Sequence, residues 1–168
     1  MAHRYPLPKN VLNIFTNGAF SKETKKAGAG IYIYDPLSGE IDESKCKRSL
    51  KLFGCKYNNV AELEAIVYAF RELRYGNLKP PRTVIIWTDC QFIVDKMNGK
   101  TNLIGKVKEH NELSQKIQDF VTFFAKKDIQ VKFEHVAAHN ELANDKIITD
   151  GNAIVGFFVQ LFMLFINE

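Results

Sequence analysis

The sequence predicts an α/β fold in which a five-stranded mixed sheet is flanked by helices. β-Forming residues dominate the amino-terminal third of the 168-residue chain, and the apolar spacing becomes helical after residue 57. Two more β-rich segments then alternate with helical ones. Because 46% of residues are hydrophobic and 25% are charged, we expect one folded domain over 1–168.

The first three strands are expected to form an antiparallel meander. Residues 11–16 alternate weakly, which predicts a buried strand before a polar loop, and residues 27–34 are rich in β-formers. Residues 35–39 combine proline and glycine, as hairpin turns do, and a third strand follows over 41–53.

Helices and the last two strands fill the rest of the chain. A helix is expected to start near Asn58 or Asn59, either of which could cap it, and to end before Gly76. The run TVIIWT predicts a central fourth strand, and QVKFEH predicts a fifth; both are added parallel to the sheet. The other expected helices cover 90–97 and 109–126, with a terminal one at the carboxyl end.

Residues 153–166 (AIVGFFVQLFMLFI) are almost wholly apolar. The run is short for a bilayer crossing, so we expect a helix buried in the core, or in an interface with a protein partner or another copy of the chain. Three cysteines without CxxC spacing and an amino terminus without an apolar signal segment favour an intracellular, reducing location. The net charge of +4 permits a polyanionic partner.

Three polar residues are expected at comparable places. Asn17 follows the first strand, Asp89 follows the fourth, and Glu62 lies near the start of the first helix. Ligand-binding groups gather at such strand ends, and Mg²⁺ prefers oxygen ligands. Each residue also has a structural explanation: Asn17 with Gly18 could form a hairpin turn, Glu62 could favour the helix dipole, and Asp89 could cap a helix.

The ordered motifs resemble ribonuclease H of type 1 over nearly the whole chain. They are IFTNGAF (14–20), AGAGIYIY (27–34), YNNVAELEAIVYAFREL (57–73), VIIWTDCQFIVDKMNG (84–99) and VKFEHVAAHNELAN (131–144). The resemblance implies a ribonuclease H-like fold that hydrolyses the RNA strand of RNA·DNA hybrids with two Mg²⁺ or Mn²⁺ ions.

The resemblance also implies site residues. Glu62 and Asp89 match metal-binding carboxylates, whereas Asn17 and Asn144 stand where the family has aspartates; Asp145 or Asp150 could replace the fourth acid. His139 matches a histidine that assists product release. Hybrid contacts are expected from Asn58, Asn59, Gly18, Lys96, Lys100 and Lys106, although the lysines could equally form a solvated face.

An amide offers metal ions one oxygen and no charge, so the asparagines predict an inactive or strongly impaired nuclease. The alternative is a nuclease-dead module that binds nucleic acid or assembles with a protein. The sequence fits both a natural chain that has lost these acids and a chain altered to trap substrate. No aromatic residue occurs between Met97 and Lys108 to stack on a base within the lysine-rich segment.

Overall fold

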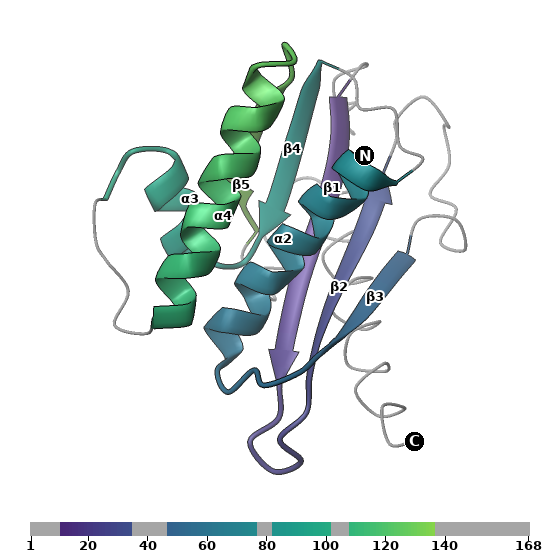
Figure 1. Ribbon diagram of the computed structural model, residues 1–168, viewed down its shortest axis with the longest axis vertical. Helices are drawn as coiled ribbons and strands as arrows, with labels where there is room; N and C mark the ends of the chain where they lie inside the picture. The colour runs from purple at the N-terminus through teal and green to yellow at the C-terminus, as the bar shows by residue number, and fades with distance from the viewer. Residues whose placement is uncertain (1–10, 35–46, 77–81, 102–107, 137–168) are drawn as a thin grey trace, which may run out of the picture.

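The computed structural model describes residues 11–34, 47–76, 82–101 and 108–136 (Figure 1). They form a five-stranded sheet in the order β3-β2-β1-β4-β5, with helices packed on it. The elements are β1 (Val11–Phe20), β2 (Ala27–Tyr34), β3 (Lys47–Leu52), α2 (Asn58–Tyr75), β4 (Thr83–Thr88), α3 (Gln91–Met97), α4 (Lys108–Ala125) and β5 (Gln130–His135).

The mixed topology confirms the predicted sheet. β1, β2 and β3 pair antiparallel, while β4 runs parallel to β1 and β5 runs parallel to β4. The parallel strands need long crossover connections, which α2 and α4 supply. In Figure 1, both helices cross in front of the same face of the sheet.

The core lies between this face and the two long helices. Phe70 of α2 is fully buried, and its ring centroid lies 5.4 Å from that of Phe120 and 5.9 Å from that of Phe124, both on α4. Phe133 of β5 completes this aromatic cluster at 6.3 Å. The helical spacing of the apolar residues in α2 and α4 thus brings both helices onto the sheet.

The opposite face of the sheet carries a second set of aromatic rings. Phe15 stacks on Trp87 with centroids 6.0 Å apart and contacts Tyr32 at 6.1 Å. The indole Nε1 of Trp87 donates a hydrogen bond to Oδ1 of Asn13 over 2.9 Å. These contacts join β1, β2 and β4 on the side away from α2.

Several predicted boundaries were wrong. β1 continues to Phe20, so Asn17 and Gly18 lie inside a strand, opposite Gly30 and Ala29, and form no hairpin turn. Tyr57, rather than Asn58 or Asn59, holds the N-cap position of α2, and no described side chain caps it.

Other predicted features lie outside the described residues. These include the start of the third strand, the turn at 35–39, residues 102–107 of the predicted lysine-rich linker and the apolar run 153–166. Among the helices that the structure describes, none has the length and apolar character needed to cross a membrane.

Candidate active site

The candidate site lies where β4 stops beside the longer β1. Pairing between these strands ends at Phe15 and Trp87, whereas β1 stays paired with β2 as far as Phe20. The hydroxyl of Thr16 donates a hydrogen bond over 3.1 Å to the Trp87 carbonyl, just past the last pair. Beyond that point, no described strand covers this edge of β1, so its backbone N–H groups are available to side chains.

Gly18 lets α2 approach this edge closely. A Cβ at this position would lie 2.0 Å from the carbonyl carbon of Ala61 and 2.3 Å from the backbone nitrogen of Glu62. Neither backbone atom can move without displacing the helix, so a side chain is excluded sterically. Gly18 therefore has a packing role that the sequence pattern did not reveal.

Glu62 reaches the open edge of β1 from α2. Its Oε2 accepts a hydrogen bond from the Gly18 N–H over 3.0 Å, and only 5% of the residue is exposed. It lies beyond the first turn of α2, which holds no acidic residue, so the helix-dipole explanation was wrong. Burial and, second, the neighbouring Asp89 carboxylate raise the pKa of Glu62 to about 9, against the lowering effect of the Gly18 hydrogen bond.

Asp89 lies in the turn from β4 into α3 and faces Glu62. The Thr88 hydroxyl accepts a hydrogen bond from the Cys90 N–H over 3.1 Å, which shapes this turn. Cys90, not Asp89, holds the N-cap position of α3, so the capping explanation for Asp89 was also wrong. Burial, followed by the nearby Glu62 and Asp89 charges, raises the pKa of the Cys90 thiol against the lowering effect of backbone hydrogen bonds. The site thus holds two close carboxylates.

Asn17 precedes Gly18 on the same strand. Side chains alternate along a strand, so Asn17 points to the face that carries Phe15, away from α2. The Glu62 carboxylate, in contrast, lies at the open edge of β1, between the two faces. Asn17 and Glu62 therefore both lie at the open edge of β1, on different sides of it. Asn17 contributes an uncharged amide.

Asn58 joins the start of α2 to the end of β1. Its Oδ1 accepts a hydrogen bond from the Phe20 N–H over 3.3 Å, and both Asn58 and Asn59 are exposed. Among the predicted lysines, Lys96 lies in the last turn of α3 with its Nζ 5.7 Å from the Phe92 ring centroid, and Lys100 is exposed just beyond that helix. With a rise of about 1.5 Å per residue, Lys96 lies roughly 8 Å along α3 from Gln91, the first residue of that helix.

The remaining predicted residues, His139, Asn144, Asp145, Asp150 and Lys106, lie outside the described residues. Within the described ranges, no group of three or more His, Cys, Asp and Glu side chains is placed to hold a metal ion. The described part of the site therefore offers the carboxylates of Glu62 and Asp89 and the amide of Asn17.

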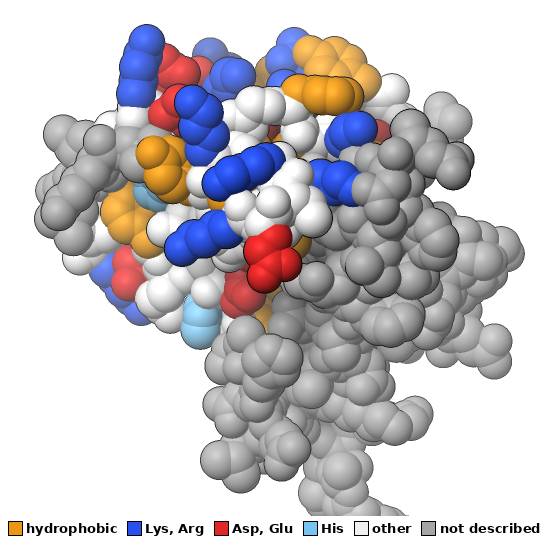
Figure 2. Space-filling view, turned by 90° about the horizontal axis from the view of Figure 1, so that it is seen from below, with side chains coloured by type: hydrophobic (Ala, Val, Ile, Leu, Met, Phe, Trp, Pro, Cys, Tyr) orange, Lys and Arg blue, Asp and Glu red, His pale blue; other side chains and the backbone are white. Residues whose placement is uncertain are grey.

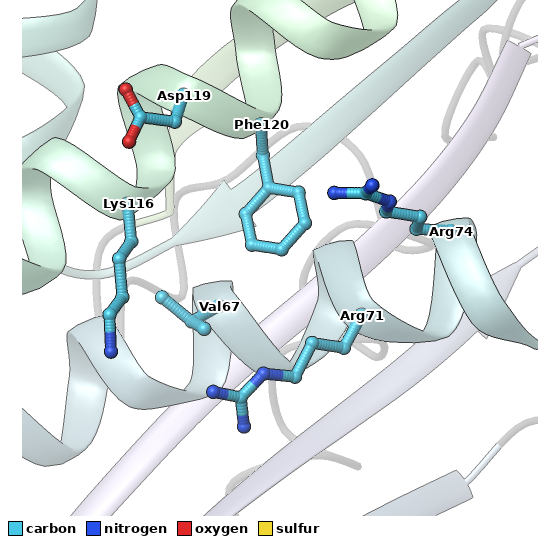
Figure 3. A pocket seen from close by; sticks show the side chains of 6 residues that line it. All are labelled: Val67, Arg71, Arg74, Lys116, Asp119 and Phe120. Atoms are coloured by element: carbon cyan, nitrogen blue, oxygen red, sulfur yellow. The ribbon is translucent and has the colours of Figure 1, made fainter.

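A separate cavity of about 300 Å³ lies between α2 and α4 (Figure 3). Its lining combines Arg71, Arg74 and Lys116 with Asp119, around Val67 and Phe120. It is built on the helices alone and includes none of the site residues predicted from the sequence. The candidate site instead lies towards the end of the molecule where β1 stops and α2 begins, and the view of that end in Figure 2 shows many lysine and arginine side chains.

Comparisons with known proteins agree with this architecture. The family model for RNase H matches residues 9–156. Uncharacterized protein YpeP of Bacillus subtilis (strain 168) is 32% identical over 108 residues, which are 64% of this chain and 45% of that protein. The match thus spans less than half the length of this curated relative.

Two solved structures show the same fold at low sequence identity. LC11-RNase H1, in a complex with an RNA/DNA hybrid, has a TM-score of 0.61 and 20% identity, covering 90% of this chain and 98% of that one. RNase H1 from the halophilic archaeon Halobacterium salinarum NRC-1 has a TM-score of 0.60 and 13% identity, covering 87% and 95%.

Proposed function

Because this chain belongs to the RNase H family, whose model matches residues 9–156, we propose that it binds RNA·DNA hybrids at the end of β4 and is an impaired hydrolase of the RNA strand. The observation that carries the proposal is the buried Glu62 carboxyl, held by Gly18 and facing Asp89. Two acids held close together in a folded protein repel each other when both are ionised. Such a costly arrangement is typical of functional sites.

The two carboxylates fit a hard divalent cation. A positive ion between Glu62 and Asp89 would remove the repulsion that contributes to the raised pKa of Glu62. When bound, Mg²⁺ or Mn²⁺ supplies positive charge that stabilises a phosphodiester during hydrolysis. Glu62 would be oriented by the Gly18 N–H, and Asp89 by the turn that Thr88 and Cys90 form.

Asn17 explains why we propose impaired turnover. A carboxylate at this position would bring a third negative charge to the edge of β1, enough to share between two cations, whereas the amide brings one neutral oxygen. Asn144 is proposed to remove a negative charge from the fourth ligand position in the same way, with Asp145 or Asp150 as replacement acids. His139 is proposed to assist product release. The two acids Glu62 and Asp89 are better suited to binding one divalent ion than to binding two.

The hybrid is proposed to lie across the start of α2. Asn58 and Asn59 are exposed there and carry amide groups that can bond to base edges or sugars. Lys96, Lys100 and Lys106 would attract phosphates on the α3 side. The alternative function, a nuclease-dead module that binds the hybrid or a protein partner, is favoured by the neutral side chain of Asn17.

A cleavage assay separates these functions. The full chain, Asn17→Asp and Asn17→Asp/Asn144→Asp are incubated with a labelled RNA·DNA hybrid and Mg²⁺ or Mn²⁺. Restoring the acids should raise the cleavage rate by roughly 100-fold or more, since the lost effect is electrostatic. Adding Asp89→Asn to the double variant should abolish the gain. If the double variant binds hybrid but never cleaves it, the hydrolase proposal fails and the binding module stands.

A further inference from the structure

Two exposed aromatic side chains lie in the loop that leads into α2. Phe53 is 84% exposed and Tyr57 is 51% exposed. The other large apolar side chain exposed in the described residues, Tyr75, lies at the far end of α2 with 71% exposure. The Phe53 ring is the most exposed of these side chains, so most of its apolar surface is free to contact a ligand.

A lysine accompanies the Phe53 ring. The Nζ of Lys51 lies 5.3 Å from the ring centroid, within the range of a cation–π contact. The next residue, Gly54, adopts a φ of +71°, and apart from its chain neighbours no residue lies within 4 Å of where its Cβ would be. The chain therefore turns in open solvent immediately after Phe53, which leaves the ring accessible.

The strand register places Phe53 next to a hairpin that carries further lysines. Lys51 pairs with Gly28 and Leu52 pairs with Ala27, so Phe53 follows directly beside the hairpin that joins β1 to β2. That hairpin carries Lys22 and Lys25, both exposed. The hydrogen bond from the Phe20 N–H to Asn58 connects the hairpin to the start of α2, at the end of the molecule shown in Figure 2.

We propose that Phe53, with Lys51, is a stacking platform for an unpaired nucleotide that flanks the bound hybrid. Bases inside a duplex stack on one another and present no free face, whereas an unpaired base can lie on an aromatic ring. The surrounding lysines would hold the adjoining phosphates. This inference rests on the proposed function, because it places the platform next to the hybrid contacts Asn58 and Asn59.

The test compares a blunt RNA·DNA hybrid with hybrids that carry a single-stranded overhang on either strand. Binding to the full chain is measured by fluorescence anisotropy in metal-free buffer, where cleavage is prevented. An overhang should tighten binding by about five-fold or more, the lower end of the contribution of one stacked base. Phe53→Ala should remove this gain and Phe53→Trp should retain it, while binding of the blunt hybrid stays unchanged.

Tyr75→Ala is the matched control. Tyr75 is also exposed and also lies near a cation, with the Arg74 guanidinium 5.0 Å from its ring centroid, yet it is at the opposite end of α2. Its removal should leave the overhang gain intact. Two results would refute the stacking platform: an equal affinity for blunt and overhanging hybrids, or an overhang-dependent gain in affinity that persists in Phe53→Ala. If the blunt hybrid fails to bind but a single-stranded oligonucleotide binds through Phe53, the proposed function fails while the platform stands.

Discussion

Replacing Glu62 by glutamine should stabilise the metal-free protein at alkaline pH. The carboxyl of Glu62 is buried and faces Asp89, and its pKa rises from 4.5 to about 9. For an acid whose pKa is raised by folding, the native state binds more protons than the unfolded state between these two values. Its contribution to stability is therefore fully present below pH 4.5 and is lost as the pH rises towards 9.

The size of the effect follows from this interval. Each pH unit above the unfolded pKa costs about 1.4 kcal/mol, which amounts to about 4 to 5 kcal/mol at pH 8 and about 1 kcal/mol at pH 5. Glutamine has the shape of the protonated acid and can still accept the hydrogen bond from the Gly18 N–H. The Glu62→Gln variant should therefore escape the penalty.

Urea denaturation of both proteins at pH 5 and pH 8, with EDTA present, measures the difference in unfolding free energy. Glu64→Gln is the control, because Glu64 lies two positions along the same helix and is partly exposed. Mg²⁺ at pH 8 should stabilise the wild-type chain more than the Glu62→Gln variant. If Glu62→Gln and wild type lose stability in parallel between pH 5 and pH 8, the carboxyl does not occupy the buried position beside Asp89.

Two further predictions concern packing and pH. Gly18→Ala should lower the unfolding free energy by about 3 kcal/mol or more, because the added Cβ would meet the backbone of α2. Urea denaturation measures this loss. A change within about 0.5 kcal/mol, which is the effect of a surface substitution, would contradict the close approach of α2 to Gly18. His110 is buried against Phe92, with ring centroids 4.6 Å apart, and burial followed by the Lys96 charge lowers its pKa below 6.5. Its stabilising contribution is thus complete above pH 6.5 and is lost as the pH falls. The stability difference between wild type and His110→Leu should shift in favour of the variant from pH 7 to pH 5, and a constant difference would refute this.

Local patterns in the sequence were enough to predict the elements that the structure describes. The helical spacing of Leu63, Phe70 and their apolar neighbours predicted α2, and the compact apolar run TVIIWT predicted β4, because both patterns reflect which side chains must leave water. The order of these elements predicted a mixed sheet, since parallel neighbours require crossover helices. The places of Glu62 and Asp89 at the ends of predicted elements, together with their motifs, predict that the two acids lie close together.

Boundaries and caps were less predictable. Asn17 with Gly18 satisfies the local requirements of a turn and of a strand equally, and only the proximity of Ala61 decides that a glycine is needed inside β1. Asn58 was expected to cap α2, but its side chain instead accepts a hydrogen bond from Phe20, a partner 38 positions away in sequence. Strand ends and helix caps such as these depend on backbone groups that are distant in the sequence.

The sequence alone determined the α/β class, the described strand and helix segments apart from some boundaries, and the presence of Glu62, Asp89 and Asn17 near the ends of these elements. The tertiary structure alone decided that Glu62 is buried at the open edge of β1, that Gly18 makes this possible, and that Phe53 is left exposed in the loop before α2. The physical reason is that periodicity reports only whether a side chain is buried. Which charged group a buried side chain faces, and which backbone groups lie close to it, depends on how β1, β4 and α2 pack together.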